Sequence, residues 1–520
     1  MKKYDIVVIG SGFGGSLFSM IAKRLGKSVL LVERGKHPRF AIGESTSPLA
    51  NLIIEQLADK YHLPRLKPLT TYGPWQRTYS DIACGLKRGF SYFSHEFGKP
   101  FHDTDDHHRQ LLVAANPNSE TADTHWYRQD VDHFFQQEAI VLGVDYSDET
   151  AANLLGTDDE GVSRIRFSKG PVIWDVECNL IVDASGPRGF LSRELGIPEV
   201  ELKDYPQTAT LFSHFEGVER VENLPDFANC MNGEVPFPVD DAALHHVFDG
   251  GWIWVLRFNN GITSAGVACE TRIAERFGMA DVEAGWHRFL KSLPSVAKQF
   301  ANAKHTRPFI FSPKMTYRAE RVVGKGWAML PSAAGFVDPL FSTGIPLTLL
   351  GIERLGEILG GGSRHQELGD GLAEYGRITL EEIDWTAKFI GNCCAGFKDF
   401  HAFQEYSMHY FAAASYSEMA RRLPGANRVR RYLASDRPDF AKSVARNGDF
   451  IRSRNTNNIA DSIRAGIKTI NIAGLSDPAK RQWYGVDLQD VVNGAGKLGL
   501  EPAIVRELIK NSDWADGCRV

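Results

Sequence analysis

The N-terminal stretch YDIVVIGSGFGG constrains the fold more than any other part of the chain. Its apolar run, Tyr4–Gly10, predicts a buried strand, and the glycines that follow predict a tight turn into a helix. In this pattern Gly12 lets the backbone approach a pyrophosphate at the helix N-terminus, and Gly15 permits close packing of helix on strand. A second strand, SVLLVE, ends at Glu33, about 20 residues after the glycines, where an acid binds a ribose hydroxyl. Together these features predict an α/β protein with a Rossmann-like dinucleotide-binding unit.

Length and composition limit the class of protein around this unit. A chain of 520 residues predicts two or three folding units. The net charge of -5 argues against a nucleic-acid partner. The seven cysteines are scattered and form no CxxC pair, which argues against a disulfide framework or a structural zinc site and favours a reducing compartment. Because we also find no signal peptide and no apolar stretch of membrane-spanning length, we expect a cytoplasmic protein without a membrane span.

The polar stretch HDTDDHHR, residues 102–109, gathers side chains of the kind that bind metals. It matches no established ligand spacing, and its polarity is typical of a solvated loop. We therefore expect no metal site.

Two later segments identify the nucleotide. IVDASG is a short apolar strand ending in Asp-Ala-Ser-Gly, and LPSAAGFVDPLFSTGIP combines an apolar stretch, a small-residue turn and a helix start. With the N-terminal unit, they resemble the three FAD-contacting segments of the p-hydroxybenzoate-hydroxylase-like flavoproteins. The chain has no second GxGxxG for an NAD(P) domain, so we expect reducing equivalents from outside. The resemblance assigns cofactor contacts to Gly10, Gly12, Phe13, Gly14, Gly15, Glu33, Arg34, Asp183, Gly186, Gly335 and Asp338.

Further segments resemble the flavin-dependent halogenases, and most closely their phenol and pyrrole types. GESTSP resembles the family's Gly-Glu-Ser segment along the flavin and would place Glu44 and Ser45 there, although geranylgeranyl reductases and squalene epoxidases have similar segments. GWIWVLRFNNGITSAGV resembles the Trp-x-Trp strand, and GFVDPLFSTGI the Pro-Leu-x-Ser-(Ser/Thr)-Gly segment. GLKRGFSYF resembles the surroundings of the catalytic lysine and would place it at Lys87. HWYRQDVDHFF resembles an Arg-x-x-x-Asp helix start, in which Arg128 forms an ion pair with Asp132 or lies beside the flavin.

Three departures from the family pattern affect the interpretation. Leu256-Arg257 replaces the Ile-Pro of the tryptophan motif, and Pro331-Ser332 replaces the common Gly-Asp. Phe341 stands where tryptophan halogenases carry a glutamate. The last change implies a substrate other than tryptophan, and the first two keep a monooxygenase without a halide step as an alternative.

The resemblance implies that reduced FAD, supplied by a separate reductase, reacts with dioxygen to give a hydroperoxide at flavin carbon C4a. Chloride or bromide then attacks, and hypohalous acid crosses a tunnel to a lysine and the substrate. The halide would lie on the segment Ser342, Thr343 and Gly344, at the N-terminus of a helix that attracts negative charge. The alternative is that this helix end only faces the flavin pyrimidine ring.

Two further roles follow from the same resemblance. Trp252 and Trp254 share one face of a strand and would separate substrate from flavin; the alternative is that both are core aromatics. Lys87 shares a face with Gly89 on an alternating strand and would be the proton donor, because burial lowers the pKa of a lysine. The alternative is an exposed lysine beside Arg88.

We expect a discontinuous FAD-binding domain over residues 1–80, 150–195 and 315–360. Residues 81–149 and 196–314 would form the substrate-binding sheet, and 361–520 a mostly helical region. Within it, FKDFHAFQEYSMHYF places aromatics at helical spacing, for a core or a pocket. Six arginines between 421 and 437 form either a solvated face or a docking surface for an acidic carrier protein.

The sequence thus predicts an enzyme of secondary metabolism that uses FADH2 and dioxygen to halogenate an electron-rich aromatic compound. The substrate would be a phenol or pyrrole, free or tethered to an acyl or peptidyl carrier protein. The alternatives are a flavin-dependent monooxygenase and a saturase of the geranylgeranyl-reductase type. A flavin-binding protein without enzymatic activity is the remaining alternative.

Overall fold

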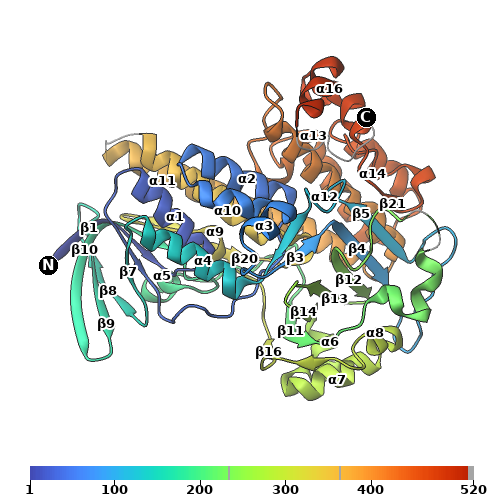
Figure 1. Ribbon diagram of the computed structural model, residues 1–520, viewed down its shortest axis with the longest axis horizontal. Helices are drawn as coiled ribbons and strands as arrows, with labels where there is room; N and C mark the ends of the chain where they lie inside the picture. Colours follow the sequence, from blue (N-terminus) through green and yellow to red (C-terminus); the bar gives the residue numbers. More distant parts are fainter. Residues whose placement is uncertain (232, 234, 362–364, 513–520) are drawn as a thin grey trace.

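The computed structural model describes residues 1–231, 233, 235–361 and 365–512. Its first sheet is built on β1 (Lys2–Ile9), the strand predicted at the N-terminus, which pairs in parallel with β2 and β10. The strand order is β18-β19-β10-β1-β2-β7, and β8 and β9 extend from β10 as a hairpin at the left of Figure 1. The other strands are β2 (Val29–Val32), β7 (Asp145–Ser147), β8 (Ala151–Thr157), β9 (Ser163–Lys169), β10 (Val172–Asp183), β18 (Val323–Gly324) and β19 (Trp327–Met329).

Helices pack around this sheet and around one another. α1 (Phe13–Arg24) follows the glycine turn directly and contacts α4 (Arg128–Val141) and α10 (Gly344–Gly361). α10 also contacts α2 (Pro48–Lys60) and α11 (His365–Ala395). Shorter helices connect the layers: η1 (Pro64–Thr70), α3 (Tyr72–Thr78), α5 (Phe190–Glu194), α9 (Pro331–Ala334) and η5 (Leu340–Ser342). The expected Rossmann-like α/β architecture is confirmed.

The second sheet, at the lower right of Figure 1, collects strands from three distant parts of the chain. Its order is β15-β11-β14-β13-β12-β4-β5-β21, with β16 also paired to β11. The strands are β4 (Gly89–Ser94), β5 (Gln110–Ala114), β11 (Thr208–Glu216), β12 (Ala243–Phe248), β13 (Gly251–Arg257), β14 (Thr263–Glu270), β15 (Lys304–His305), β16 (Ile310–Ser312) and β21 (Trp483–Tyr484).

The two faces of this sheet belong to two hydrophobic cores. Along β13, Ile253 and Val255 lie in a core with the helices at the foot of the molecule, whereas Trp252, Trp254 and Leu256 lie in the large core shared with the first sheet. This alternation follows from the two-residue period of a strand. The helices on the outer side are η2 (Val221–Asn223), η3 (Pro225–Met231), α6 (Thr271–Arg276), η4 (Met279–Asp281), α7 (Glu283–Lys291) and α8 (Pro294–Gln299).

Two small sheets join the layers. β3 (Cys84–Lys87) pairs with β6 (Asp123–Trp126) and sets Lys87 opposite Asp123, and β17 (Tyr317–Arg318) pairs with β20 (Gly335–Phe336). The strand expected to run through LKRGFSYF is therefore interrupted at Arg88, because β3 and β4 pair with different partners. Lys87 consequently stands at the junction of the two large sheets.

The C-terminal third is mostly helical, as expected. α12 (Phe400–Arg422) contacts α2 and α11. The helices that follow it are η6 (Tyr432–Ala434), α13 (Pro438–Arg452), α14 (Ile459–Ile467), η7 (Pro478–Lys480), α15 (Leu488–Asn493), η8 (Ala495–Leu498) and α16 (Pro502–Lys510). Of these, η6, α13, α14 and η8 contact α12. This region also contributes β21 to the second sheet, and β7 lies in the first sheet although its residues fall within the range 81–149 assigned to the substrate sheet. Within the described residues, no helix is both long and apolar enough to cross a membrane.

One close backbone contact fastens α11 to the segment before β11. A Cβ atom at Gly391 would lie 1.8 Å from the carbonyl oxygen of Asp204. We predict that Gly391→Ala destabilises the protein by about 1–3 kcal/mol, because the backbone must shift to accept the methyl group. Gly369, on the same helix with nothing within 4 Å, is the matched control, and Gly369→Ala should stabilise by up to about 1 kcal/mol. Chemical denaturation measures both variants, and equal stabilities would contradict the close approach.

Candidate functional site

The turn between β1 and α1 depends on its glycines. Gly10 has φ 101°, and a Cβ atom there would lie 2.6 Å from the carbonyl oxygen of Ala184. A Cβ atom at Gly15 would lie 1.9 Å from the carbonyl oxygen of Gly10. Gly12 leaves a cradle at the helix N-terminus, because the position of its missing Cβ is 3.7 Å from the guanidinium nitrogens of both Arg39 and Arg128. A side chain at Gly12 would fill the space where a pyrophosphate is expected.

The two arginines beside this cradle are each paired with an acid. Arg39 donates to Glu33 at 3.0 Å, and the backbone N–H of Ser11 donates to the same carboxylate at 3.0 Å. Burial pushes the pKa of Glu33 upward, but Arg39 and the neighbouring N–H groups hold it below its usual value. Arg128 pairs with Asp132 through two bonds of 2.8 and 2.9 Å, so the predicted ion pair forms. Asp132 also accepts from the N–H of Phe13 at 3.2 Å, and its Oδ2 lies 3.4 Å from the Cβ position of Gly12. The groups that would hold a pyrophosphate here are therefore two guanidinium groups, each shared with an acid, at a helix N-terminus.

The Gly-Glu-Ser segment supplies polar atoms at the next position. Glu44 is buried and its Oε1 lies 2.8 Å from Nε2 of His214 on β11. Its second oxygen, Oε2, and the buried hydroxyl of Ser45 have no hydrogen-bond partner within the described part of the chain. Buried polar atoms without partners are uncommon, and they are expected where a polar cofactor binds. These atoms therefore fit a flavin between the two sheets.

Two predicted cofactor carboxylates are occupied by the chain itself. Asp183 accepts from the N–H and the hydroxyl of Ser185 at 2.9 and 2.6 Å and from the N–H of Leu191 at 2.7 Å. Asp338 accepts from the N–H of Leu340 at 2.7 Å and from the hydroxyl of Tyr205, and burial raises its pKa to about 6. Both acids hold turns beside the cofactor segments. Among the other predicted contacts, Phe13 and Gly14 are buried at the start of α1, Arg34 is exposed, Gly186 faces open space and Gly335 packs against Ile383.

The start of α10 is held in an unusual conformation. Phe341 and Ser342, with φ 64° and 58°, lie in the left-handed region, which is strained for residues other than glycine. Tyr410 of α12 donates to the carbonyl of Phe341 at 2.7 Å and its ring stacks on Phe341 at 4.3 Å. Thr343 is buried, whereas Gly344 is exposed beside open space, so the N-terminus of an 18-residue helix is accessible there. This geometry is compatible with both interpretations of the segment, a halide site and a contact for the pyrimidine ring.

Lys87 is completely buried beside this segment. Its Nζ donates to the carbonyl of Thr46 at 2.5 Å and to the hydroxyl of Ser342 at 3.2 Å, and it lies 4.1 Å from the ring centre of Phe90. The structure thus joins the predicted catalytic lysine to the predicted halide segment across 255 residues of sequence. The alternative of an exposed lysine is excluded, and it is Arg88 that reaches outward, to the carbonyl of Pro117.

Burial dominates the electrostatics of Lys87. It lowers the pKa of the ammonium to about 7, against the opposing effect of Asp123. Burial also raises the pKa of Asp123 to about 6, and Lys87 opposes that shift. The amide of Asn51 donates to Asp123 at 2.7 Å. A lysine that titrates near neutrality can donate a proton under physiological conditions.

A cavity of about 120 Å³ lies next to this lysine, between the second sheet and the C-terminal helices. Phe90, which contacts the Lys87 ammonium, forms part of its wall. An apolar cavity of about 150 Å³ in another protein binds benzene, so a single aromatic ring fits a space of this size. The wall comes from α2, β4, β5, α12, η6, β21 and α15, and includes Ser47, Pro48, Phe90, Val113, Tyr410, Phe411, Ser415, Glu418, Tyr432, Tyr484 and Asp487.

The tryptophan pair lies on the inner face of β13, as predicted. Both side chains are buried, their ring centres are 5.8 Å apart, and Trp254 donates to the hydroxyl of Ser264 at 3.2 Å. Neither ring belongs to the wall of the cavity; Trp252 instead lines a smaller pocket with Tyr205 and Asp338. The pair forms part of the core between the sheets, and a barrier role remains a prediction.

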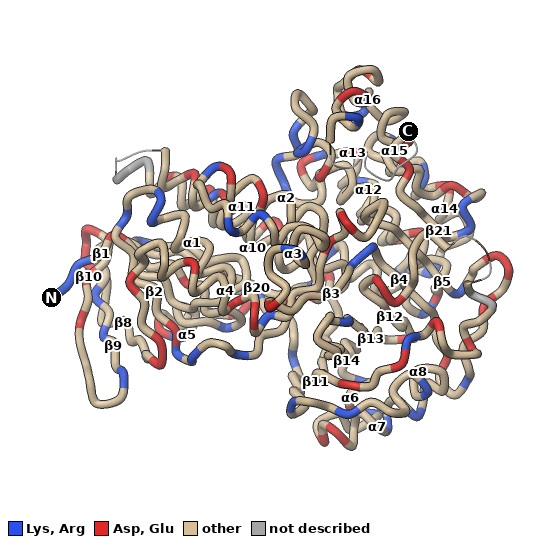
Figure 2. The backbone as a smooth tube through the Cα atoms, viewed as in Figure 1, with Lys and Arg blue, Asp and Glu red and all other residues tan. Residues whose placement is uncertain are grey.

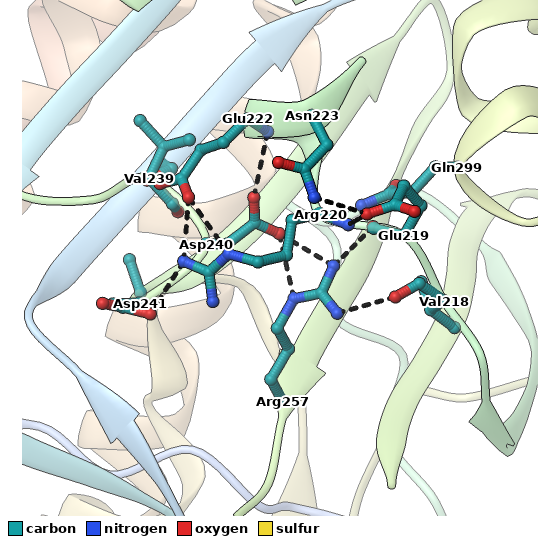
Figure 3. Close-up of polar contacts among 12 residues, drawn as sticks. Val218, Glu219, Arg220, Glu222, Asn223, Val239, Asp240, Asp241, Arg257 and Gln299 are labelled. Atoms are coloured by element: carbon teal, nitrogen blue, oxygen red, sulfur yellow. Dashed lines mark hydrogen bonds and ion pairs between the residues drawn. The ribbon is translucent and has the colours of Figure 1, made fainter. Parts of the chain in front are cut away.

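The departure at Arg257 has a structural explanation. Arg257 donates to the buried carboxylate of Asp240 at 2.9 Å and to the carbonyls of Val218 and Glu219 at 2.8 and 2.5 Å (Figure 3). Arg220 adds an ion pair to Asp241 at 2.9 Å. This network fastens the loop between β11 and β12 to the end of β13. The residue that replaces the family's proline therefore serves the stability of the second sheet.

Three of the six arginines between 421 and 437 pair with neighbouring acids, and both signs of charge are interspersed over the molecule (Figure 2). Arg421 pairs with Glu353, and Arg431 lies 3.5 Å from Glu374. Arg422 lies near two acids, Glu55 and Glu418, and Arg437 covers the ring of Tyr416. Arg428 and Arg430 are exposed just before Tyr432 and Leu433 of the cavity wall.

Sequence reasoning missed three residues of the site. Asp123 left no signal, because its importance comes from pairing β6 with β3. Tyr410 and Glu418 lie on one face of α12 with Phe411, at helical spacing. The aromatic pattern in FKDFHAFQEYSMHYF pointed to this face, and extending it by two turns would have reached Glu418. Among the described residues, no group of three metal-ligating side chains gathers, at residues 102–109 or elsewhere.

The strained segment at Phe341 depends on Tyr410. We predict that Tyr410→Phe destabilises the protein by about 1–3 kcal/mol, because it leaves the buried carbonyl of Phe341 without its donor. Tyr432→Phe is the matched control, since Tyr432 is also buried in the cavity wall and its hydroxyl bonds to no described residue. Urea denaturation compares the two variants. A loss of stability that is the same for both would show that the bond to Phe341 contributes nothing.

This chain is similar to known proteins in both sequence and fold. The sequence profile of the family described as tryptophan halogenase matches residues 116–395, more than half of the chain. The tetracycline 7-halogenase of Kitasatospora aureofaciens is 28% identical over 410 residues, which cover 77% of this chain and 71% of the relative. The monodechloroaminopyrrolnitrin halogenase PrnC of Pseudomonas fluorescens is also 28% identical over 410 residues, covering 78% and 70%.

A third relative is a Pseudoalteromonas luteoviolacea brominase of 1H-pyrrole-2-carbonyl on a peptidyl carrier protein. It is 26% identical over 360 residues, covering 67% of this chain and 75% of the relative. Among solved structures, the halogenase PltM in complex with phloroglucinol and FAD has the same fold, with a TM-score of 0.82, 22% identity and coverage of 92% of this chain and 99% of that one. The chain belongs to the tryptophan halogenase family, a family of flavin-dependent halogenase enzymes.

Proposed function

We propose that this protein uses FAD, dioxygen and chloride or bromide to halogenate an electron-rich aromatic compound by way of hypohalous acid. The position of Lys87 carries this proposal. Its ammonium contacts Ser342 at the start of α10 and, on the other side, the ring of Phe90 in the cavity wall. A proton donor between a halide site and the cavity beside it, called the chamber from here on, suits halogenation.

The residues around the glycine turn fit FAD. The Gly12 cradle with Arg39 and Arg128 would hold the pyrophosphate, Glu33 the ribose end, and Glu44 and Ser45 the flavin side. When bound in reduced form, FAD would supply two of the four electrons that reduce dioxygen, and the halide would supply the other two as it becomes hypohalous acid. We infer that a separate flavin reductase delivers the reduced cofactor, because the sequence contains no second nucleotide-binding motif.

The chain's own groups then direct the oxidised halogen. Backbone N–H groups of Thr343 and Gly344 would hold the halide at the N-terminus of α10, where the helix dipole favours an anion. Lys87 would hydrogen-bond hypohalous acid and give a proton to the hydroxide that leaves it. The buried Trp252 and Trp254 would keep the ring to be halogenated away from the flavin.

The chamber supports a small aromatic substrate. Its volume suits a single ring, and Phe90, Tyr410 and Phe411 offer aromatic surfaces. By their names, the relatives act on tetracycline, on monodechloroaminopyrrolnitrin and on 1H-pyrrole-2-carbonyl on a peptidyl carrier protein. We infer a phenol or a pyrrole for this chain, free or carried on a protein. Arg428 and Arg430 beside the chamber would contact an acidic carrier.

Replacing the lysine tests the proposal. With FAD, a flavin reductase, NADH and bromide, we predict that the wild type brominates phloroglucinol and that Lys87→Met lowers the rate by about 10²–10⁴-fold. Lys99→Met is the control, because Lys99 is an exposed lysine paired with Glu96. Mass spectrometry detects the products. An oxygenated product that forms without bromide, or full activity in Lys87→Met, would favour the monooxygenase instead.

The pH dependence gives a second test of Lys87. Burial lowers the pKa of Lys87 to about 7. The side chain is therefore a charged ammonium below that pH and loses its proton as the pH rises through it. We predict that bromination of anisole, which has no ionisable group, falls as the pH rises through about 7. Rates measured from pH 5 to pH 9 should lose this limb in Lys87→Met. A rate that increases across the same range would contradict a protonated lysine.

A further inference from the structure

The acidic side chains of the chamber wall have no basic side chains opposite them among the described lining residues. The wall contains two acids, Glu418 and Asp487, and neither lysine nor arginine nor histidine among the described lining residues. Asp487 is exposed and its carboxylate caps α15 by accepting from the N–H of Gln489 at 2.8 Å. The hydroxyls of Tyr410 and Ser415 donate to backbone carbonyls. Glu418 is therefore the buried acid that remains to recognise a ligand.

Glu418 has only loose partners of its own. It is 7% exposed, and one of its oxygens, Oε1, lies 3.3 and 3.4 Å from two nitrogens of Arg422 on the next turn of α12. No described residue donates to the other oxygen. A buried carboxylate normally has several short hydrogen bonds, since an unpaired one is costly. Its position in the wall of a cavity implies a donor that arrives with the ligand.

We propose that Glu418 is a catalytic residue of the chamber, which accepts a hydrogen bond and then the proton from an O–H or N–H group on the aromatic ring that is halogenated. This inference rests on the halogenation proposed above and extends it to the substrate. The ring would carry a hydroxyl, an amino group or a ring N–H, and no carboxylate, because a substrate anion would be repelled by two acids without a cation in the described wall.

The reaction balances with hypohalous acid as the oxidant. The carbon–halogen bond forms as the oxygen–halogen bond breaks, and the leaving hydroxide takes a proton from Lys87 to become water. The ring has then given two electrons to the halogen, and Glu418 takes the O–H or N–H proton so that the ring stays neutral. The C–H bond breaks next, and its electron pair restores the aromatic ring. Its proton replaces the one lost by Lys87, and Glu418 returns its own to the substituent.

The surroundings of Glu418 shift its pKa toward neutrality, the range of a general base. Burial raises its pKa to about 7, Arg422 opposes that shift and Asp123 adds to it. The charged groups that face it are Arg422 on α12, Asp123 on β6 and, at the cavity mouth, Asp487; Glu55 on α2 lies 3.9 Å from Arg422. A carboxyl that titrates near neutrality is matched to general-base catalysis. The Glu418 carboxylate forms as the pH rises through about 7. A reaction rate that needs it therefore rises with pH, whereas a rate that needs the Lys87 ammonium falls.

Phenol and anisole separate the role of Glu418 from that of the chamber. They differ by the O–H group, which anisole lacks. With FAD, flavin reductase, NADH and bromide, we expect Glu418→Gln to lower kcat/KM for phenol by about 10²–10⁴-fold and to affect anisole far less. The variant should also lose the limb that rises through about pH 7 with phenol. Glu405→Gln is the matched control, because Glu405 is buried on the same helix but outside the cavity wall.

The outcomes are distinct. Equal losses for phenol and anisole in Glu418→Gln, or an unchanged phenol profile, would overturn the proposal. If the wild type brominates neither probe, the proposed halogenation fails, and calorimetric binding then decides about Glu418. In that measurement the wild type should prefer phenol over anisole, and Glu418→Leu should lose the preference. A preference that survives in Glu418→Leu would also overturn the role of Glu418.

Discussion

The site depends on the polar groups that hold the buried ammonium of Lys87. A buried charge is stable only where polar groups surround it, and here they come from separate parts of the fold. Thr46 supplies a carbonyl from the segment before α2, Ser342 a hydroxyl from the start of α10, and Asp123 a carboxylate from the opposite strand. The Gly-Glu-Ser segment, the start of α10 and the small β3–β6 sheet must therefore all be in place before the lysine can be accommodated. The same requirement brings the proposed cofactor segments and the proposed substrate chamber together.

The C-terminal helices form a large part of the chamber wall. α12 packs on β4 through aromatic contacts with Phe90 and Tyr92, and β21 extends the second sheet by pairing with β5. The chamber is the space left between them, and its residues come from both ends of the chain. Because the wall is assembled from several elements, changes in α12 or in the 470–491 segment would alter the proposed substrate site while the first sheet stays the same.

Two pairs of non-glycine residues with a strained backbone lie beside residues of the chamber wall. Phe341 and Ser342 border it on one side, and Leu433 and Ala434 on another, all with positive φ. Such residues cost about 1–3 kcal/mol each and persist only where tertiary contacts hold them. Tyr410 holds the first pair by its bond to the Phe341 carbonyl, and Glu382 holds the second by accepting from the N–H of Tyr432.

The sequence by itself determined the parts of this protein that rest on local pattern. The glycine turn, the strands on either side of α1, the acid at Glu33 and the paired tryptophans on one strand face follow from side-chain size and from the two periods of regular structure. The family, and Lys87 with it, followed from motif resemblance. What only the tertiary structure decided are contacts between distant segments: Asp123 opposite Lys87, Tyr410 on Phe341, and Glu418 in the chamber. No local pattern encodes them, because burial and charge at these positions depend on which surfaces the packed elements bring together.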